Sequence, residues 1–365
     1  MSISYIIILL SPIYVPLVIS ALLFFQFEKR SFSKQFLGVF MINTTIVFVG
    51  NFYYFTQDFN TYALMHPLHI FVVLMIYPGI YTYTSSLVRR NFKLKQHLWH
   101  YAPALFYLII TSFIFFLLLN SEERFYFLSE YRHFPDFSMP ILKILFIIRI
   151  SNMALLFGQI FFYGYRTFKL MRKHRNDIEN TFSSPNKFRL SWIKSFNILF
   201  FFTAISSIGF YAIDPSKVFG NELVLAVPLF CFSIAIWFFG IMGINQQILI
   251  IEDIEIELLY EEIQTDSNLL FQQITSYFEL QKSFLDADLK IFDLCKKIGS
   301  NRTYISNAIN ENAGLNFSGY VNSYRIKEAK QIMKENPLCT LEVVGERAGF
   351  GSLSSFTRAL KSVKP

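Results

Sequence analysis

The chain has 365 residues, of which 53% are hydrophobic and 16% charged, and its formal net charge is +7. A soluble domain usually carries about 25% charged residues, so this composition excludes a wholly soluble protein. Three widely spaced cysteines, Cys231, Cys295 and Cys339, indicate neither a disulfide framework nor a zinc site. Long apolar stretches fill the chain up to about residue 251, and charged residues return after it. We therefore expect one lipid-facing part and one aqueous part.

Seven apolar stretches in the first 250 residues are each long enough to cross a membrane as a helix, which takes about 20 residues. They lie at residues 3–25, 36–56, 64–88, 101–120, 141–165, 193–213 and 223–250. The first has no basic residue before it, while Lys29 and Arg30 follow it, so we expect a retained span rather than a signal peptide. Residues 1–250 are predicted to form a seven-transmembrane domain, which we interpret as a sensor.

The basic residues of the connecting loops predict the orientation of these spans. The first, third and fifth loops hold fifteen lysines and arginines, whereas the second, fourth and sixth hold four. Short cytoplasmic loops carry the excess of basic residues, so the odd loops are predicted to be cytoplasmic and the N-terminus outside. Because the number of spans is odd, the C-terminal part is then predicted to lie in the cytoplasm.

Polar residues inside the spans are candidates for function. Arg149 lies about 12 Å into the fifth span, where a charge needs a partner or a watery cavity, so it is a candidate ligand or signalling residue. A structural pairing or a snorkelling arginine is the alternative. His66 with His69 and His97 with His100 have a spacing that can share a metal, but no carboxylate or cysteine stands beside them. We predict no metal site and no cofactor.

Residues 251–274 are acidic and contain no lysine or arginine. Their apolar residues share neighbouring faces of a helix, which predicts a helix connecting the two halves. Such a helix can pair with a second copy as a short coiled coil, which would make the protein a homodimer. A solvated spacer helix is the alternative.

Residues 275–365 carry two short patterns fifty residues apart. Each places a small residue, Cys295 or Gly345, four positions before a glycine, Gly299 or Gly349. A helix-turn-helix unit needs this arrangement, because the small residue lets the helices cross closely and the glycine adopts the turn conformation. The segment has a net charge of +4, the sign that phosphate binding requires.

The second helix of each unit has its own signals. Asn301 and Ser352 are suitable N-caps, and Ile305 and Phe356 are the expected inward anchors. Between the two units, a longer helix is predicted from the cap at Asn316 to a stop before Pro337. Its apolar stripe comprises Phe317, Tyr320, Val321, Tyr324, Ala329, Ile332 and Met333. Two units in tandem, joined by this helix, indicate a DNA-binding domain in an all-α protein.

With these signals, the segment resembles the C-terminal domain of the AraC family of bacterial transcription activators. The matching residues are Asp293-Leu294-Cys295, Asn322-Ser323-Tyr324-Arg325, Ala329-Lys330 and Ala348-Gly349-Phe350-Gly351-Ser352, together with Phe356, Arg358 and Lys361. The whole arrangement is similar to the seven-span regulators of this family in Bacteroidota-type bacteria. That resemblance implies a multi-pass protein of the bacterial inner (cytoplasmic) membrane that binds double-stranded DNA and responds to an unknown small-molecule or membrane signal.

In that family the second helix of each unit lies in the major groove. Carried over by position, the resemblance implies base contacts by Thr303, Ser306 and Asn307 in the first unit and by Leu353, Ser354, Thr357 and Arg358 in the second. Arg302, Tyr304 and Ser352 are expected near phosphates. Asparagine and arginine side chains can pair with adenine and guanine edges, which agrees with this assignment.

Two departures from the family pattern bear on the second unit. Gly345 stands where the family usually has alanine, and the sequence stops at Pro365, about ten residues before the family's closing helix ends. We expect a loosened second unit. The alternative is a membrane transporter or receptor-like protein whose DNA-binding domain is vestigial or truncated. An enzyme is not expected, because no nucleophile–base pair, carboxylate pair or phosphate-binding glycine loop is found.

Overall fold

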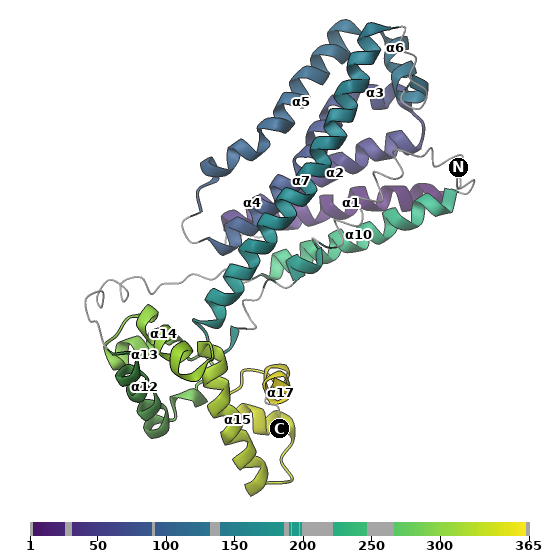
Figure 1. Ribbon diagram of the computed structural model, residues 1–365. Helices are drawn as coiled ribbons and strands as arrows, with labels where there is room; N and C mark the ends of the chain where they lie inside the picture. The colour runs from purple at the N-terminus through teal and green to yellow at the C-terminus, as the bar shows by residue number, and fades with distance from the viewer. Residues whose placement is uncertain are drawn as a thin grey trace. The chain divides into compact units, whose positions relative to one another are not determined.

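The computed structural model describes residues 3–25, 31–89, 92–131, 139–185, 190, 192–196, 198, 222–246 and 266–362. The chain divides into two compact units. Unit 1 comprises Met1–Met171 and Ser191–Gln246, and unit 2 comprises Arg172–Leu190 and Gln247–Pro365. The described residues are helical and form no β-strand, which confirms the predicted all-α class (Figure 1).

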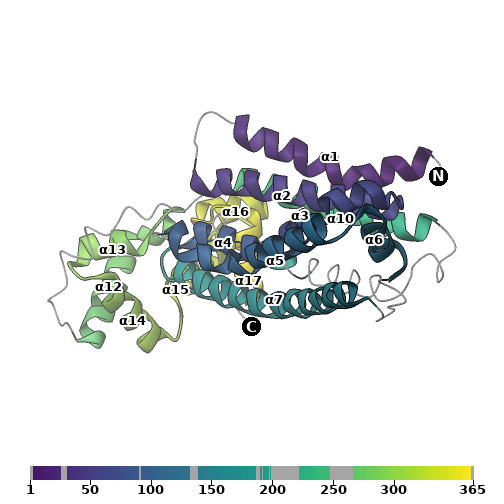
Figure 2. The same ribbon diagram turned by 90° about the horizontal axis from the view of Figure 1, so that it is seen from above.

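Unit 1 is built from helices, most of them apolar. They are α1 (Ile3–Phe25), α2 (Phe32–Phe55), α3 (Phe59–Leu74), α4 (Ile76–Val88), η1 (Leu94–Tyr101), α5 (Ala102–Phe113), η2 (Ile114–Leu118), α6 (Ser121–Tyr126), η3 (Phe127–Tyr131), α7 (Pro140–Glu179) and α10 (Glu222–Asn245). Helix α1 packs against α2 and α10. Seen from above, α1 and α7 lie on opposite sides of this unit (Figure 2).

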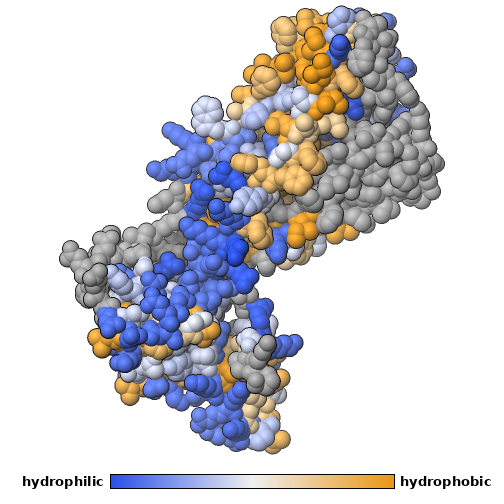
Figure 3. Space-filling view, in the orientation of Figure 1, coloured by the Kyte–Doolittle hydropathy of each residue, from blue (hydrophilic) through white to orange (hydrophobic). Residues whose placement is uncertain are grey.

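Among the residues that the structure describes, four helical segments are long and apolar enough to cross a membrane, namely Phe32–Phe55, Phe59–Val88, Leu94–Leu118 and Pro140–Glu179. They correspond to the second to fifth predicted spans. Helices α1 and α10 cover the first and seventh, and the predicted span 193–213 lies almost entirely outside the described residues. Large apolar side chains such as Phe106, Ile109 and Leu117 are exposed on α5 and η2, and hydrophobic residues gather on that end of the unit (Figure 3). An apolar surface of this kind is typical of a helix that faces lipid.

The third predicted span is divided into two helices at Met75. Pro78 has no N–H to donate to the carbonyl of Leu74, so the helical hydrogen-bond ladder is interrupted there. The amide of Gly79 then donates to the Met75 carbonyl at 2.9 Å. Pro67, Pro78 and Gly79 predict a kink in this span, and the break lies one turn before Pro78.

Helix α7 continues well past residue 165, where its predicted span ends. Its 40 residues run from Pro140 to Glu179. At 1.5 Å per residue this helix is about 60 Å long, roughly twice the thickness of the hydrocarbon core. The apolar run sets the span, but the lysines and arginines after it are good helix formers and prolong the helix. Its last turns, from Arg172 on, belong to unit 2.

Unit 2 contains α12 (Ser267–Gln281), η5 (Ser283–Leu285), α13 (Ile291–Ile298), α14 (Arg302–Ala313), α15 (Phe317–Glu335), α16 (Leu341–Arg347) and α17 (Leu353–Ser362). One buried core joins α12, α13, α14 and the start of α15. A second, smaller core joins the middle of α15 to α16 and α17 around Phe356. The long helix α15 therefore belongs to both cores.

The predicted connecting helix, 251–274, is described only from Asp266 onward. That part is the beginning of α12, which Asp266 caps by accepting a hydrogen bond from the Asn268 amide. Leu270 and Ile274 are buried in the core with α13 and α14. This stretch is therefore part of the helical domain. Residues 251–265 and the proposed dimer contact lie outside the described residues.

Candidate nucleic-acid interface

The first helix-turn-helix unit is formed by α13 and α14. Gly299 ends α13 in the left-handed conformation, with φ +73°, which a residue with a Cβ adopts at a cost. The Asn301 side chain accepts a hydrogen bond from the Tyr304 amide at 2.9 Å and so caps α14. Cys295 and Ile305 are fully buried. The predicted small residue, turn, cap and anchor of this unit are confirmed.

The second unit is formed by α16 and α17 and has the same plan. Gly349 has a φ of +86°, and the Ser352 side chain accepts from the Ser355 amide at 3.3 Å. Gly345 lies so close to Phe356 that a Cβ there would be 3.1 Å from the ring. The smaller residue thus lets the two helices approach, which is the role expected of it, and Phe356 is the buried anchor.

A buried arginine in α15 joins the loop before α13 to the turn of the second helix-turn-helix unit. Arg325 is 0% exposed, and its Nε donates to the Phe284 carbonyl at 2.6 Å, while Nη2 donates to the Asp286 carbonyl at 2.7 Å. Its guanidinium also lies 5.7 Å from the ring centre of Phe350, in the turn of the second unit. Burial lowers the pKa of Arg325 to about 10, while the nearby Asp286 and Asp288 oppose that shift. The group remains charged at neutral pH.

The predicted contact residues of the first unit lie on α14. Thr303 and Asn307 are exposed or half-buried, as are Ser306 and Arg302, and none of the four is part of the core. Tyr304 is half-buried because its ring packs against the first core. The outward side of α14 is therefore polar and presents hydroxyl and amide groups, the types that can bond base edges.

The predicted contact residues of the second unit lie at the start of α17 and along it. Ser352, Leu353 and Ser354 are exposed. Thr357 is half-buried, and its hydroxyl donates to the Leu353 carbonyl at 2.8 Å. Arg358 lies one residue further along the helix and is exposed. Leu353 is 43% exposed, so it is not part of the second core. Both units thus present a capped helix with a polar outer side.

A third segment belongs to unit 2 that the sequence patterns did not indicate. The end of α7 and the residues after it pack on the first helix-turn-helix unit. Arg302, an expected phosphate contact in that unit, donates through Nη2 to the Asp177 carbonyl at 3.4 Å. No motif or periodicity marks this segment in the sequence. Arg325 is indicated only by the family resemblance, and its partners are too distant in sequence to be recognised beforehand.

The other candidates of the sequence lie in unit 1. Arg149 is half-buried on α7. The histidine pairs pack among aromatic rings: His66 stacks on Phe115 with 4.6 Å between ring centres, and the Tyr163 hydroxyl lies 3.1 Å from Nδ1 of His100. Among the described residues, no three His, Cys, Asp or Glu side chains gather as metal ligands would.

Two capped helix-turn-helix units on one bracing helix define the C-terminal part as a DNA-binding domain of the tandem helix-turn-helix class. In agreement, a protein-family model described as a helix-turn-helix domain matches residues 294–364, and this model is of the AraC type. The match extends from α13 through α17. Comparison with curated proteins and with solved structures gave no match. The chain therefore carries the DNA-binding domain of a transcription regulator.

Proposed function

We propose that the protein is a membrane-bound one-component transcription regulator that binds double-stranded DNA sequence-specifically. The observation that carries this proposal is the presence of two helix-turn-helix units, each with a capped, outward-facing polar helix. The described part of the same chain also contains four helices apolar enough to span a membrane. In this proposal the apolar half responds to a signal at the membrane, and unit 2 reads the DNA.

The proposed reading residues are those on the outer sides of α14 and α17. Thr303, Ser306 and Asn307 contact bases from the first unit, and Leu353, Ser354, Thr357 and Arg358 contact bases from the second. Arg302, Tyr304 and Ser352 contact phosphates. Asn307 and Arg358 are assigned the largest share of the selectivity, because amide and guanidinium groups can each make two hydrogen bonds to one base.

The remaining parts of the proposal concern the membrane half. We place the protein in the bacterial inner membrane with seven spans, the N-terminus outside and unit 2 in the cytoplasm, supported by the distribution of basic residues in the loops. Arg149 is proposed as the residue that takes part in sensing. A homodimer formed through residues 251–274 is also proposed, since tandem readers gain affinity from a second copy on adjacent sites.

The test uses the full-length protein in lipid nanodiscs and labelled DNA from upstream of its own gene. Binding is followed by fluorescence anisotropy against a scrambled duplex over a range of salt concentrations. Asn307→Ala and Arg358→Ala should each weaken selective binding by about 1–3 kcal/mol, roughly 5- to 150-fold, and together abolish it. Lys334→Ala, which removes a charge near the end of α15, is the control and should leave selectivity unchanged.

Each outcome bears on the proposal. If the parent binds both duplexes equally, the regulator assignment fails and a transporter or receptor-like protein with a vestigial DNA-binding domain is favoured. If only Asn307→Ala has an effect, the first unit reads the DNA alone.

A further inference from the structure

Residues 177–184 form a connection within unit 2 that we call the strap. The strap begins in the last turn of α7 and continues past the end of that helix at Glu179. In sequence it is more than a hundred residues from the helix-turn-helix units, yet it belongs to the same compact unit as they do. Ile178, Thr181 and Ser183 are each 2% exposed or less. Such burial is typical of a structural part of a domain rather than of a surface loop.

The strap is joined to the domain through the main chain. Phe182 forms an antiparallel bridge with Lys290, the residue that precedes α13. The Ser183 amide donates to the Leu289 carbonyl at 3.0 Å, and the Ile291 amide donates to the Thr181 carbonyl at 2.9 Å. Both bonds satisfy backbone groups of buried residues, so undocking the strap would expose or orphan them.

Side chains of α15 hold the strap from a second direction. The Ser318 hydroxyl donates to the Ser183 carbonyl at 3.1 Å. Arg325 donates to the hydroxyl of Ser183 at 3.0 Å and to that of Ser184 at 3.3 Å. The guanidinium that bonds the loop at residues 284–286 and lies beside Phe350 therefore also fixes the strap. Ser184 lies near Gly351 as well, 3.8 Å from the position of a Cβ there, so the strap reaches the turn of the second unit.

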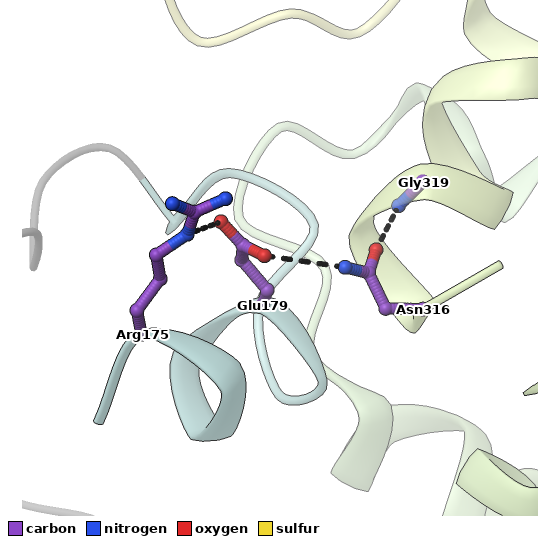
Figure 4. Close-up of polar contacts among 4 residues, drawn as sticks. All are labelled: Arg175, Glu179, Asn316 and Gly319. Carbon is purple, nitrogen blue, oxygen red and sulfur yellow. Dashed lines mark hydrogen bonds and ion pairs between the residues drawn. The ribbon is translucent and has the colours of Figure 1, made fainter. Parts of the chain in front are cut away.

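The strap also contacts the cap of α15. Glu179 accepts a hydrogen bond from the Asn316 side-chain amide at 3.3 Å, while the side-chain oxygen of Asn316 accepts from the Gly319 amide at 2.8 Å (Figure 4). Glu179 also pairs with Arg175, one turn earlier on α7, at 3.1 Å. The last turn of α7 is thus bonded to the residue that begins the bracing helix.

Together these contacts involve the start of both helices of the first helix-turn-helix unit, α13 and α14, and the start of α15. Ile291 is the first residue of α13, Arg302 is the first residue of α14, and Asn316 caps α15. The amino-terminal residues of a recognition helix are those that approach the base edges in helix-turn-helix proteins. A displacement of the strap would therefore move the N-terminal end of α14, which is the end expected to approach the base edges.

We propose that the strap is the element through which α7 sets the position of α14, so that a shift or rotation of α7 in the membrane alters DNA binding. This inference rests on the proposed function. Helix α7 is continuous from Pro140, within a candidate span, to Glu179 in the strap. A rotation of this helix is therefore carried along its hydrogen-bonded backbone to the strap.

The first experiment tests whether the strap is docked in the full-length protein. Phe182 and Lys290 form a bridge pair without mutual hydrogen bonds, whose Cα atoms are typically about 4.5 Å apart, close enough for a disulfide. Phe182→Cys and Lys290→Cys are combined with Cys231→Ser and Cys339→Ser, and a protease site is inserted between residues 255 and 262. After oxidation in nanodiscs and cleavage, the two fragments should stay joined until a reductant is added.

Two matched controls accompany this pair. The single variants Phe182→Cys and Lys290→Cys should separate after cleavage, which excludes a disulfide with the buried Cys295. If the fragments of the double variant also separate, the strap is not docked on the domain and the proposal fails.

The second experiment tests whether α7 acts through the strap. One alanine or seven helix-forming residues are inserted between Arg172 and Lys173, both exposed on α7. One inserted residue rotates the end of α7 by about 100° and moves it 1.5 Å, whereas seven residues restore the helical phase to within about 20°. The one-residue variant should change the affinity for the upstream DNA at least about tenfold, and the seven-residue variant should return toward the parent.

Amide hydrogen exchange of residues 302–313, measured without DNA in the same proteins, provides a second readout. The one-residue insertion should change exchange in α14 while the 182–290 disulfide still forms, which shows that the domain remains folded. Unchanged exchange and unchanged affinity in both insertion variants would overturn the coupling. Formation of the disulfide in the double-cysteine variant, together with unselective DNA binding by the parent, would refute the proposed function alone, because the exchange readout of the strap would remain.

Discussion

The two helix-turn-helix units share a plan but differ in what surrounds them. The first is embedded in the larger core, with α12 on one side and the strap across the starts of its helices. The second has a smaller core around Phe356, which it shares with α15, and its turn at Gly349 packs on the backbone of Leu285 in the loop at residues 284–286. The same local pattern thus gives one unit that is supported from several sides and another that is held mainly from one side.

The contact between the second unit and that loop is unusually close. A Cβ at Gly349 would lie 2.7 Å from the Leu285 backbone, whereas a Cβ at Gly299 would meet no atom within 4 Å. The two turn glycines therefore satisfy different requirements. Gly299 is needed for its conformation alone, and Gly349 for its conformation and for space. The difference teaches that a position with the same role in two repeats can tolerate substitution very differently.

The largest expected effect comes from Arg325, which lies between the loop at residues 284–286, shortly before α13, and Phe350 in the turn of the second helix-turn-helix unit. Arg325→Met should lower the free energy of unfolding of unit 2 by about 4 kcal/mol, because the Phe284 and Asp286 carbonyls lose a charged donor. Amide exchange of the full-length protein in nanodiscs should show α13–α14 and α16–α17 losing protection together. Arg325→Lys retains the charge and should lie between the parent and the methionine variant. Loss of protection in only one of the two helix pairs would show that Arg325 does not couple them.

Gly349→Ala should have the second largest effect on stability and should destabilise the second helix-turn-helix unit selectively. The left-handed conformation costs a residue with a Cβ about 1–2 kcal/mol, and the Leu285 backbone must also move, so we expect a loss of about 3 kcal/mol or more. In segment-resolved exchange, α16 and α17 should lose protection while α14 retains most of it. Equal loss in α14 would mean that the two cores unfold as one.

Gly299→Ala should have the smallest effect of the three. Only the conformational cost of about 1–2 kcal/mol applies, since nothing occupies the space of the added methyl group. The melting temperature of unit 2 in detergent, compared with that of Gly349→Ala, measures the contrast directly. A loss as large as that of Gly349→Ala would contradict the comparison between the two turns.

Much of the helical domain can be predicted from local sequence signals. The caps at Asn301, Asn316 and Ser352 and the left-handed glycines are found where they were predicted, because capping and turn formation involve residues only a few positions apart. The stop of α15 before Pro337 is also local, with Asn336 as its C-cap. Of the seven spans that the apolar runs predicted, four correspond to helices in the described residues that are long and apolar enough to cross a membrane. The contacts to DNA remain a prediction.

Contacts between residues far apart in sequence could be found only in the folded protein. Ser183 and Arg325 are separated by 142 positions, and a serine that accepts one hydrogen bond from a buried guanidinium leaves no periodic pattern for the sequence to reveal. The length of α7 is a second example, since hydropathy locates the apolar part of a helix but not its polar continuation. The helices and turns could be predicted, because they depend on neighbouring residues and on the regular spacing of buried apolar residues. The strap was decided by packing, because backbone bridging and a shared arginine exist only once distant segments have been brought together.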